Sequence, residues 1–464
     1  MGSESGKVDN VSSDTPYCAT MRHLTFRTLA SVSYVALALA LAGCADSTAP
    51  VNQRMIDVLL DFCSDQTPVW FAFQNQNQQW QRVTPNAEGT FAFTAADRLT
   101  IAYVTQVGSD YTTQILNVGN TELEKVSGVA CLEESGTKQL NGTVAGLGTS
   151  QVAQVSMFVS STYVTPQQSS FALTQLASRP LDLVATRATV AGSNQDFDRI
   201  IIRRNLNLVS NATIPTLDFN SIEAAAPATV VGAVSGLTSN ETAFMALNFF
   251  SQLATTHFLQ YASPLFNGSV SMETVPSQLL NTGDYHDVFV IATTSAGDVR
   301  GVENFFGAPA NQSLALSTVL APPTVGPVAT TPNVRLRAVV ARQPQYNSAV
   351  TVLYDQQHNQ FSSSEVAVTT TQGYADVGTW DMSIPDLSGV SGWQTAWGLA
   401  SGGGTVSWTV TAYGGRPELL FGASPVLPET IQYASKSSTF AAAQAYGGCR
   451  SGGISIGRRS RRCV

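Results

Sequence analysis

The sequence predicts an all-β protein made of several antiparallel β-sandwich modules in tandem. Three observations support this prediction. From residue 55 onward, β-branched and aromatic residues alternate with polar ones, Gly, Pro, Asn and Ser interrupt these stretches at short intervals, and helix patterns are nearly absent. The chain has 464 residues, which is enough for about three or four domains of roughly 100–200 residues each.

Composition and charge exclude several classes of protein. Hydrophobic residues make up 44% of the chain and charged residues 12%, so disorder caused by low apolarity and high charge is excluded for most of its length. Residues 45–440 hold 16 Lys and Arg against 29 Asp and Glu, a net charge of −13 (16 − 29). This acidic balance argues against nucleic acid as a partner. After the N-terminal region, no apolar run reaches the ~18 residues of a membrane helix, which excludes a polytopic membrane protein.

The N-terminal region has the pattern of an export signal. Residues 21–27 are basic, residues 29–42 are rich in Ala and Leu, and the segment ends in Leu41, Ala42, Gly43 and Cys44. These four residues resemble the lipobox of bacterial lipoproteins. The resemblance implies cleavage before Cys44, a diacylglycerol on its thiol, and the membrane as a partner through this lipid anchor. A buried hydrophobic helix is the alternative, but the Gly-Cys end and the polar residues that follow argue against it.

The resemblance also implies a location and divides the N-terminal part of the chain. The residue after Cys44 is Ala45 and not Asp, which implies sorting to the outer membrane of the bacterial cell envelope. We therefore expect an extension outside the fold at 1–20, the lipoprotein signal peptide at 21–43 and a tether at 44–56. The β-sandwich modules follow.

The first predicted module, 57–135, contains two of the remaining cysteines. We predict a disulfide between Cys63 and Cys131, because an exported protein folds in an oxidising compartment. Two separate buried thiols are the alternative. The sequence contains no C-x-x-C motif and its four histidines are scattered, so we expect neither a metal site nor a cofactor.

The second predicted module, 136–212, contains GTVAGL at 142–147 and LDLVA at 181–185. These phrases resemble the carboxypeptidase-regulatory or transthyretin-like β-sandwich. The resemblance implies a seven-stranded accessory domain without catalytic residues. A related phrase, GAVSGL, stands at 232–237. It indicates a second, related sandwich at 213–333, which carries an insertion. Chance recurrence of a common strand-and-turn phrase is the alternative.

The fourth predicted module, 334–437, follows a Pro-rich connector at 321–327 and has immunoglobulin or fibronectin size. Its clearest strand is 405–413, where Val406, Trp408 and Val410 share one face and hydroxylated residues the other. An earlier hairpin is predicted from WFAF at 70–73 and WQRV at 80–83. The Gly/Arg-rich segment 438–464 is predicted to be a disordered tail.

No residue set predicts catalysis. GISIG at 453–457 matches G-x-S-x-G, but no histidine follows Ser455, so we interpret the match as chance. We interpret the acidic pairs at 133–134 and at 196 and 198 as solvated turns. Trp393 and Trp397 are the candidate ligand-contact aromatics, because exposed aromatic faces stack on sugar rings. Core packing is the favoured alternative for both.

The sequence thus predicts a non-enzymatic, lipid-anchored envelope protein with a binding, adhesive or structural role. Its partner would be a protein or a glycan. The alternative is a secreted glycan hydrolase that uses two carboxylates, or another envelope enzyme. Two carboxyl groups about 5–10 Å apart in an aromatic-lined groove would favour that alternative. A ligand-binding component of a transporter is disfavoured because βαβ alternation is missing.

Overall fold

The computed structural model describes residues 55–442, apart from 61–66, 77, 88, 124–136, 192–193, 254, 360–361, 376–377, 402–403 and 422. Most described residues lie in β-strands, which confirms the all-β prediction. The helical elements in these ranges are short: α1 (Asn120–Leu123), η1 (Ser277–Leu279), η2 (Pro344–Tyr346), η3 (Thr395–Trp397) and η4 (Pro417–Phe421). None of the described helices is long and apolar enough to cross a bilayer.

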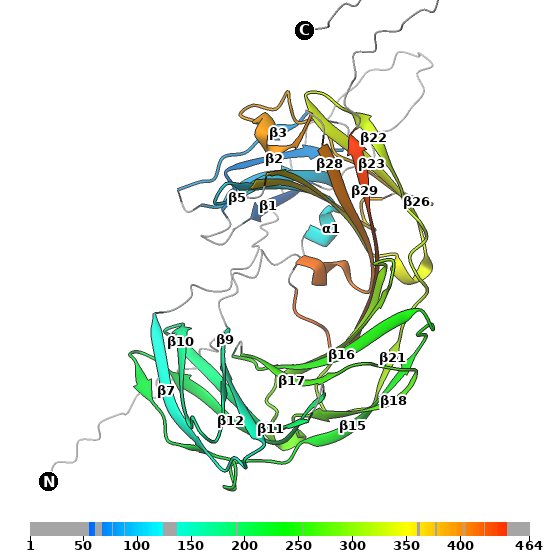
Figure 1. Ribbon diagram of the computed structural model, residues 1–464. Coiled ribbons are helices and arrows are strands. Elements are labelled where there is room, and N and C mark those ends of the chain that lie inside the picture. The colour runs from blue at the N-terminus through cyan, green and yellow to red at the C-terminus, as the bar shows by residue number, and fades with distance from the viewer. Residues whose placement is uncertain are drawn as a thin grey trace, which may run out of the picture.

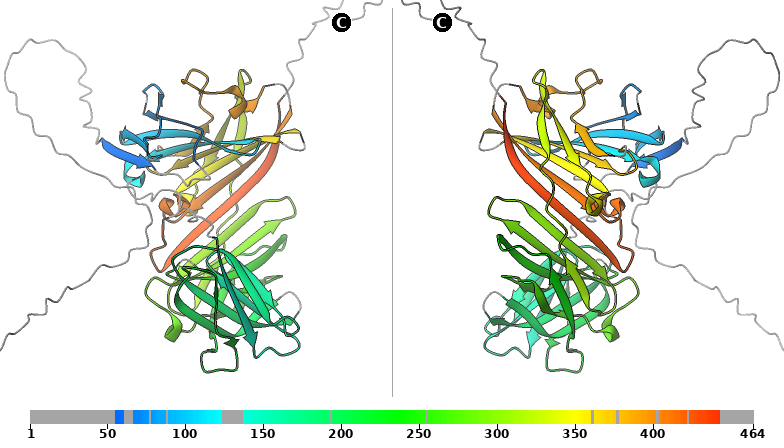
Figure 2. Two further views of the ribbon diagram at one scale, coloured as in Figure 1. Left: turned by 90° about the vertical axis from the view of Figure 1, so that its left-hand side faces the viewer. Right: turned by 90° about the vertical axis from the view of Figure 1, so that its right-hand side faces the viewer.

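One continuous sheet of 16 strands runs through the molecule and bends into an arc (Figures 1 and 2). In spatial order its strands are β3 (Gln81–Arg82), β2 (Trp70–Asn75), β5 (Arg98–Val107), β6 (Asp110–Gly119), β25 (Ser362–Thr371), β24 (Ala349–Asn359), β28 (Gly404–Gly414), β29 (Glu429–Ala442), β20 (Val299–Phe306), β19 (Tyr285–Thr294), β16 (Glu241–Phe250), β17 (Thr256–Ala262), β12 (Asn194–Asn207), β11 (Pro180–Ala191), β8 (Gln151–Met157) and β9 (Ser160–Val164).

Smaller sheets pack on successive four-strand blocks of this long sheet. They consist of β1 (Ile56–Leu60) with β4 (Phe91–Ala95); β10 (Ser170–Leu176), β7 (Lys138–Ala145), β13 (Ala212–Thr213) and β14 (Leu217–Asp218); β18 (Gly268–Thr274), β15 (Ala228–Ser235) and β21 (Gln312–Ala315); and β26 (Thr379–Ser383), β23 (Asn333–Ala341), β22 (Thr324–Ala329) and β27 (Leu399–Ala400). The result is a row of β-sandwiches, numbered here along the chain as sandwich 1 (55–123), sandwich 2 (138–219), sandwich 3 (228–316) and sandwich 4 (324–442).

Sandwiches 2 and 3 repeat one connectivity. The block β12-β11-β8-β9 with its cover β10-β7-β13 corresponds, strand for strand, to β20-β19-β16-β17 with β18-β15-β21. The two related phrases at 142–147 and 232–237 therefore occupy equivalent positions at the ends of β7 and β15. Each strand leads into a glycine with positive φ, 80° at Gly146 and 85° at Gly236, a conformation that glycine adopts without strain.

The spatial order of the sandwiches differs from their order in the chain. Sandwich 1 pairs with sandwich 4 through β6 and β25, which run parallel, and sandwich 4 pairs with sandwich 3 through β29 and β20, which run antiparallel. Sandwiches 3 and 2 meet at β17 and β12. The modules are thus joined edge to edge in the order 1-4-3-2, and their backbones hydrogen-bond across each joint.

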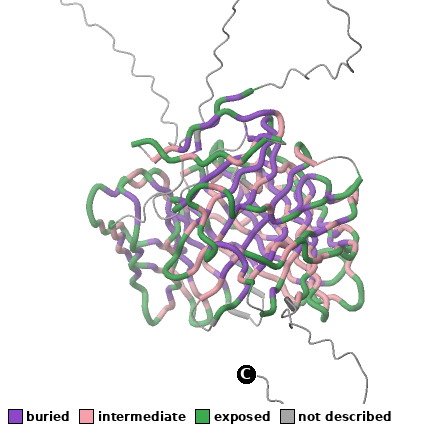
Figure 3. Tube along the Cα trace, turned by 90° about the horizontal axis from the view of Figure 1, so that it is seen from above, coloured by how far each residue is buried: buried purple, intermediate pink, exposed green. Residues whose placement is uncertain are grey.

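The cores follow the strand alternation that the sequence predicts. In β28, Val406, Val410 and Ala412 are buried and Trp408 is half-buried. The predicted hairpin is also present, since β2 pairs with β3 through Ala72 and Arg82. Figure 3 shows the buried segments running through the interior, with exposed segments at the loops.

Candidate functional site

A groove lies on the uncovered face of the long sheet, where sandwich 3 meets sandwich 4. Residues of β19, β20, β29 and β28 form its floor, and residues of η4 and of the loop after η4 form the wall opposite this floor. The groove has a volume of about 510 Å³, which is the size of a small-molecule site. Its lining consists of Tyr285, Glu303, Phe305, Thr411, Tyr413, Leu419, Leu420, Ala423, Pro425, Ile431, Tyr433 and Ser435.

Aromatic side chains dominate the floor because strand register aligns them on one face. Tyr413 on β28 lies opposite Tyr433 on β29, which lies opposite Gly301 on β20. The ring of Tyr433 covers Gly301 so closely that a side chain at that position would clash with it. Tyr285 meets Phe305 edge-on, with 6.2 Å between ring centroids. Burial raises the pKa of Tyr285 to about 12, so its phenol stays neutral at physiological pH.

Two carboxyl groups meet at one side of the groove, and we call Asp287 and Glu303 the acid pair. Glu303 lines the groove from β20, and Asp287 comes from the neighbouring strand β19 and is only 5% exposed. Burial first, and then the charge of Glu303, raise the pKa of Asp287 to about 8. Burial also raises the pKa of Glu303. A pKa of about 8 leaves Asp287 mostly protonated at neutral pH, so the two carboxyl groups hold one proton between them.

One oxygen of the acid pair has no donor on the described protein. Asn248 Nδ2 lies 3.4 Å from Asp287 Oδ2, whereas Asp287 Oδ1 is buried without a hydrogen-bond partner. A buried carboxylate oxygen without a hydrogen-bond partner destabilises the folded protein unless a proton or another positive group reaches it.

Among the described residues that line the groove, none is Lys, Arg or His. Basic residues on the surrounding elements are engaged elsewhere: Arg416 pairs with Glu429 at 2.6 Å, and Lys436 pairs with Asp298. Arg300 bonds Glu241 at 2.6 Å. The groove is therefore apolar and acidic, which favours neutral or cationic ligands over anions.

Trp393 and Trp397, the aromatics that the sequence singles out, lie at another place, where sandwich 4 packs on sandwich 1. Trp397 is only 5% exposed, and Trp393 is half-buried. Their ring centroids lie 5.6 Å apart, and both contact Trp70 of sandwich 1, at 5.2 Å from Trp393 and 6.1 Å from Trp397. Thr113 Oγ1 donates to the Trp397 carbonyl at 2.7 Å. This cluster joins two sandwiches, so core packing is the main role of Trp397.

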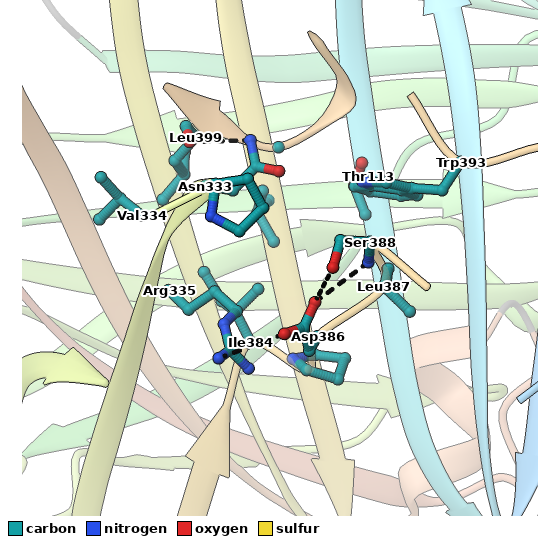
Figure 4. A pocket seen from close by; sticks show the side chains of 14 residues that line it. Thr113, Asn333, Val334, Arg335, Ile384, Asp386, Leu387, Ser388, Trp393 and Leu399 are labelled. Carbon is teal, nitrogen blue, oxygen red and sulfur yellow. Dashed lines mark hydrogen bonds and ion pairs between the residues drawn. The ribbon is translucent and has the colours of Figure 1, made fainter. Parts of the chain in front are cut away.

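A small cavity lies beside Trp393 (Figure 4). Its volume is about 20 Å³, which is room for one water molecule and not for a ligand. Within it, Ser388 donates to Asp386 from its hydroxyl at 2.6 Å and from its backbone at 3.1 Å. These bonds lower the pKa of Asp386.

The acidic residues and cysteines that the sequence offers as further candidates form no site among the described residues. Asp196 accepts a bond from Gln260 at 2.6 Å, and Asp198 pairs with Arg187 at 2.8 Å. No group of three or more His, Cys, Asp or Glu in the described ranges could hold a metal ion. The following lie outside the described residues: Leu41, Ala42, Gly43, Cys44, Cys63, Cys131, Glu133, Glu134 and Ser455.

The buried histidines have structural partners. His257 lies between Ser156 and Thr186, each 2.9 Å from a ring nitrogen, and burial lowers its pKa to about 3. His286 accepts a bond from the Val275 backbone at 3.0 Å, and burial lowers its pKa to about 4. Both imidazoles are therefore neutral in the folded protein at physiological pH.

Comparisons with known proteins do not assign a family. No family model matches the sequence, and no curated protein is detectably similar to it. Among solved structures, a crystal structure of a tetra-tandem repeat in the extending region of a large adhesion protein shares 13% identity, covers 83% of this chain and 94% of its own, and has a TM-score of 0.15. A score this low carries no functional argument. The fold and the groove alone define the class: a tandem β-sandwich protein with an aromatic, acidic groove at a joint between modules.

Proposed function

We propose that this protein is a lipid-anchored binding protein of the bacterial cell envelope, and that its folded part binds a ligand in the groove. The anchor rests on the lipobox-like residues 41–44. The binding role rests on one observation, the ligand-sized groove with half-buried aromatic rings at the joint of sandwiches 3 and 4.

The acid pair supports binding over hydrolysis. A glycosidase needs two carboxyl groups that flank the scissile bond, about 5–10 Å apart, so that sugar and water fit between them. In this groove Glu303 is the one carboxyl group among the described lining residues, and Asp287 is almost fully buried behind it. The pair therefore does not present two carboxyl groups on the two sides of a bound sugar.

Acylation is tested by the Cys44→Ser variant in bacteria fed a labelled fatty acid. Only a thiol at this position accepts the diacylglycerol, so we expect the label to disappear and the protein to become soluble or stay unprocessed. Cys449→Ser is the control and should keep the label. Unchanged labelling of Cys44→Ser would refute the lipoprotein assignment.

Binding is tested with the full-length protein in detergent and a set of neutral oligosaccharides and short neutral, basic and acidic peptides. We expect at least one neutral or basic probe to bind and acidic probes to fail. The double variant Tyr413→Ala, Tyr433→Ala should weaken that binding at least tenfold, because each ring lines the groove. Tyr163→Ala, on a tyrosine that is 58% exposed on β9, is the control. Equal binding by wild type and double variant would show that the groove is not the site.

A further inference from the structure

We propose that the ligand of the groove carries an alkylammonium group, whose positive charge lies against the acid pair and whose alkyl groups contact the surrounding rings. This inference rests on the proposed binding function and names the chemistry that the groove recognises. Three features of the site support it: a buried carboxylate oxygen without a partner among the described residues, an aromatic floor, and the composition of the rest of the lining.

The acid pair offers negative charge that the protein does not neutralise. Glu303 borders the groove, and Asp287 lies behind it with one buried oxygen, Oδ1, that has no hydrogen-bond partner. Because the described lining residues include no Lys, Arg or His, a proton held by the pair is what lowers its negative charge. A cation that enters the groove can take the place of this proton.

The rings around the acid pair are suited to a cation. Tyr285, Phe305, Tyr413 and Tyr433 all line the groove, and an organic cation within about 6 Å of an aromatic ring is attracted by its quadrupole. Cages of aromatic rings are a recurrent way to recognise quaternary ammonium groups.

The rest of the lining favours an organic cation over a metal ion. Calcium takes six to eight oxygen ligands, whereas the described residues contain no cluster of three carboxylates or histidines. The wall opposite the sheet is formed by Leu419, Leu420, Ala423 and Pro425. The side chains of this wall offer no ligand atom to a metal, but they contact alkyl groups well.

Binding of the cation releases a proton. The shared proton of the acid pair passes to solvent as the ammonium enters, and no covalent bond forms or breaks. The groups that face the pair from neighbouring elements do not change their charge between pH 6 and about 9, so they do not contribute to this proton release. They are Asn248 on β16, Tyr285 on β19, Tyr433 on β29 and Tyr413 on β28. Arg416, which precedes η4, pairs with Glu429 and is not among the lining residues. Burial raises the pKa of all three tyrosines, so their phenols stay neutral between pH 6 and about 9.

The test is calorimetric titration of the full-length protein in detergent with choline, whose charge does not change with pH. Its neutral isostere, 3,3-dimethyl-1-butanol, is the matched ligand control. We expect choline to bind at least about tenfold more tightly than the isostere. Choline affinity should rise from pH 6 to 9, and heats in buffers of different ionisation enthalpy should show the release of up to one proton. N-acetyl-lysine amide and N-acetyl-arginine amide then show whether a primary ammonium or a guanidinium is also accepted.

Variants locate the site. Glu303→Gln and Asp287→Asn should each weaken choline binding at least tenfold and flatten its pH dependence. Glu365→Gln removes a carboxylate from β25 outside the groove and should change neither. If a variant misfolds, the pH dependence of choline binding to wild type and the comparison of choline with its isostere still test the proposal.

Two outcomes would overturn the proposal: equal binding of choline and its isostere, or unchanged choline binding by folded Glu303→Gln. A neutral oligosaccharide that binds through Tyr413 and Tyr433 while choline does not would also overturn it, but would leave the proposed binding function intact.

Discussion

At the residue scale, Arg187 and Arg300 perform the same task in two sandwiches. Arg187 donates to the carbonyl of Gly146 at 2.7 Å and pairs with Asp198, and Arg300 donates to the carbonyl of Gly236 at 2.6 Å and pairs with Glu241. Each arginine thus holds the turn that follows the first strand of its sandwich. The bond from Arg300 lowers the pKa of Glu241 to about 2, which keeps this carboxylate charged. Buried charge is compensated here within the protein, unlike in the acid pair.

His257 makes the stability of the fold depend on pH. Its folded pKa is about 3 and its unfolded pKa about 6.5, so between these values the unfolded chain binds the extra proton. Its contribution is complete above pH 6.5 and falls as the pH drops, by about 1.4 kcal/mol per unit. Between pH 6.5 and 5, we expect the free energy of unfolding, measured with urea, to fall by about 2 kcal/mol more for wild type than for His257→Asn.

The histidine prediction has a matched control. His358 lies on the surface of β24, where its ring bonds Ser364 at 2.7 Å. His358→Asn therefore makes the same substitution at an exposed site, and it controls for the loss of an imidazole as such. If His257→Asn showed the same slope as wild type, burial of a neutral imidazole would not explain acid sensitivity.

At the element scale, the sequence predicts strands well where one face is buried and the other is wet. β28 is such a strand, and its alternation identifies its core face. β2 is different, because Phe71 packs in the core of sandwich 1 while Trp70 on the opposite face packs toward sandwich 4. Its apolar run at 70–73 therefore reflects two cores, which no local pattern distinguishes from one.

The groove could not be predicted from the sequence for a related reason. Alternation in β19 places Asp287 and Phe289 on one face, but which face stays uncovered depends on where β15 and β18 pack. Glu303 approaches Asp287 because β19 pairs with β20 in the register Phe289 to Glu303. The opposite wall comes from η4, in the connection between β28 and β29, whose path has no periodic signal.

The contact between η3 and sandwich 1 yields a stability prediction. Trp70 is 1% exposed and touches both Trp393 and Trp397, and its Nε1 donates to the Ser391 carbonyl at 3.1 Å. Trp70→Ala should lower the free energy of unfolding by about 3–5 kcal/mol, because a large cavity remains. Urea unfolding measures this loss.

Hydrogen exchange reports where the Trp70→Ala variant loosens. The amides of η3 should lose protection along with those of β2. Val107→Ala, on a residue that is 75% exposed at the end of β5, should change neither property. Loss confined to sandwich 1 would mean that the tryptophan cluster does not join the two modules.

At the scale of the whole molecule, the sequence predicts modules in a row but not how they join. The edge strand β29 pairs with β20, and β6 pairs with β25, across large separations in the chain. An edge strand shows its own alternation but does not specify its partner, since backbone groups make the pairing. The joint also forms the groove, which takes Tyr285 and Glu303 from sandwich 3 and Tyr413 from sandwich 4.

If the long sheet makes the sandwiches one cooperative unit, damage to one side of a joint should spread across it. Ala434 lies in β29 opposite Arg300 on one side and Ala412 on the other. Ala434→Pro removes a backbone donor and should cost about 3 kcal/mol or more. By hydrogen exchange, we expect β19 in sandwich 3 and β24 in sandwich 4 to lose protection together. Ala172→Pro in β10, whose sheet stays within sandwich 2, should leave β24 protected. If the amides of β24 lose protection while those of β19 keep it, the joint brings the two halves of the groove together without coupling their folding.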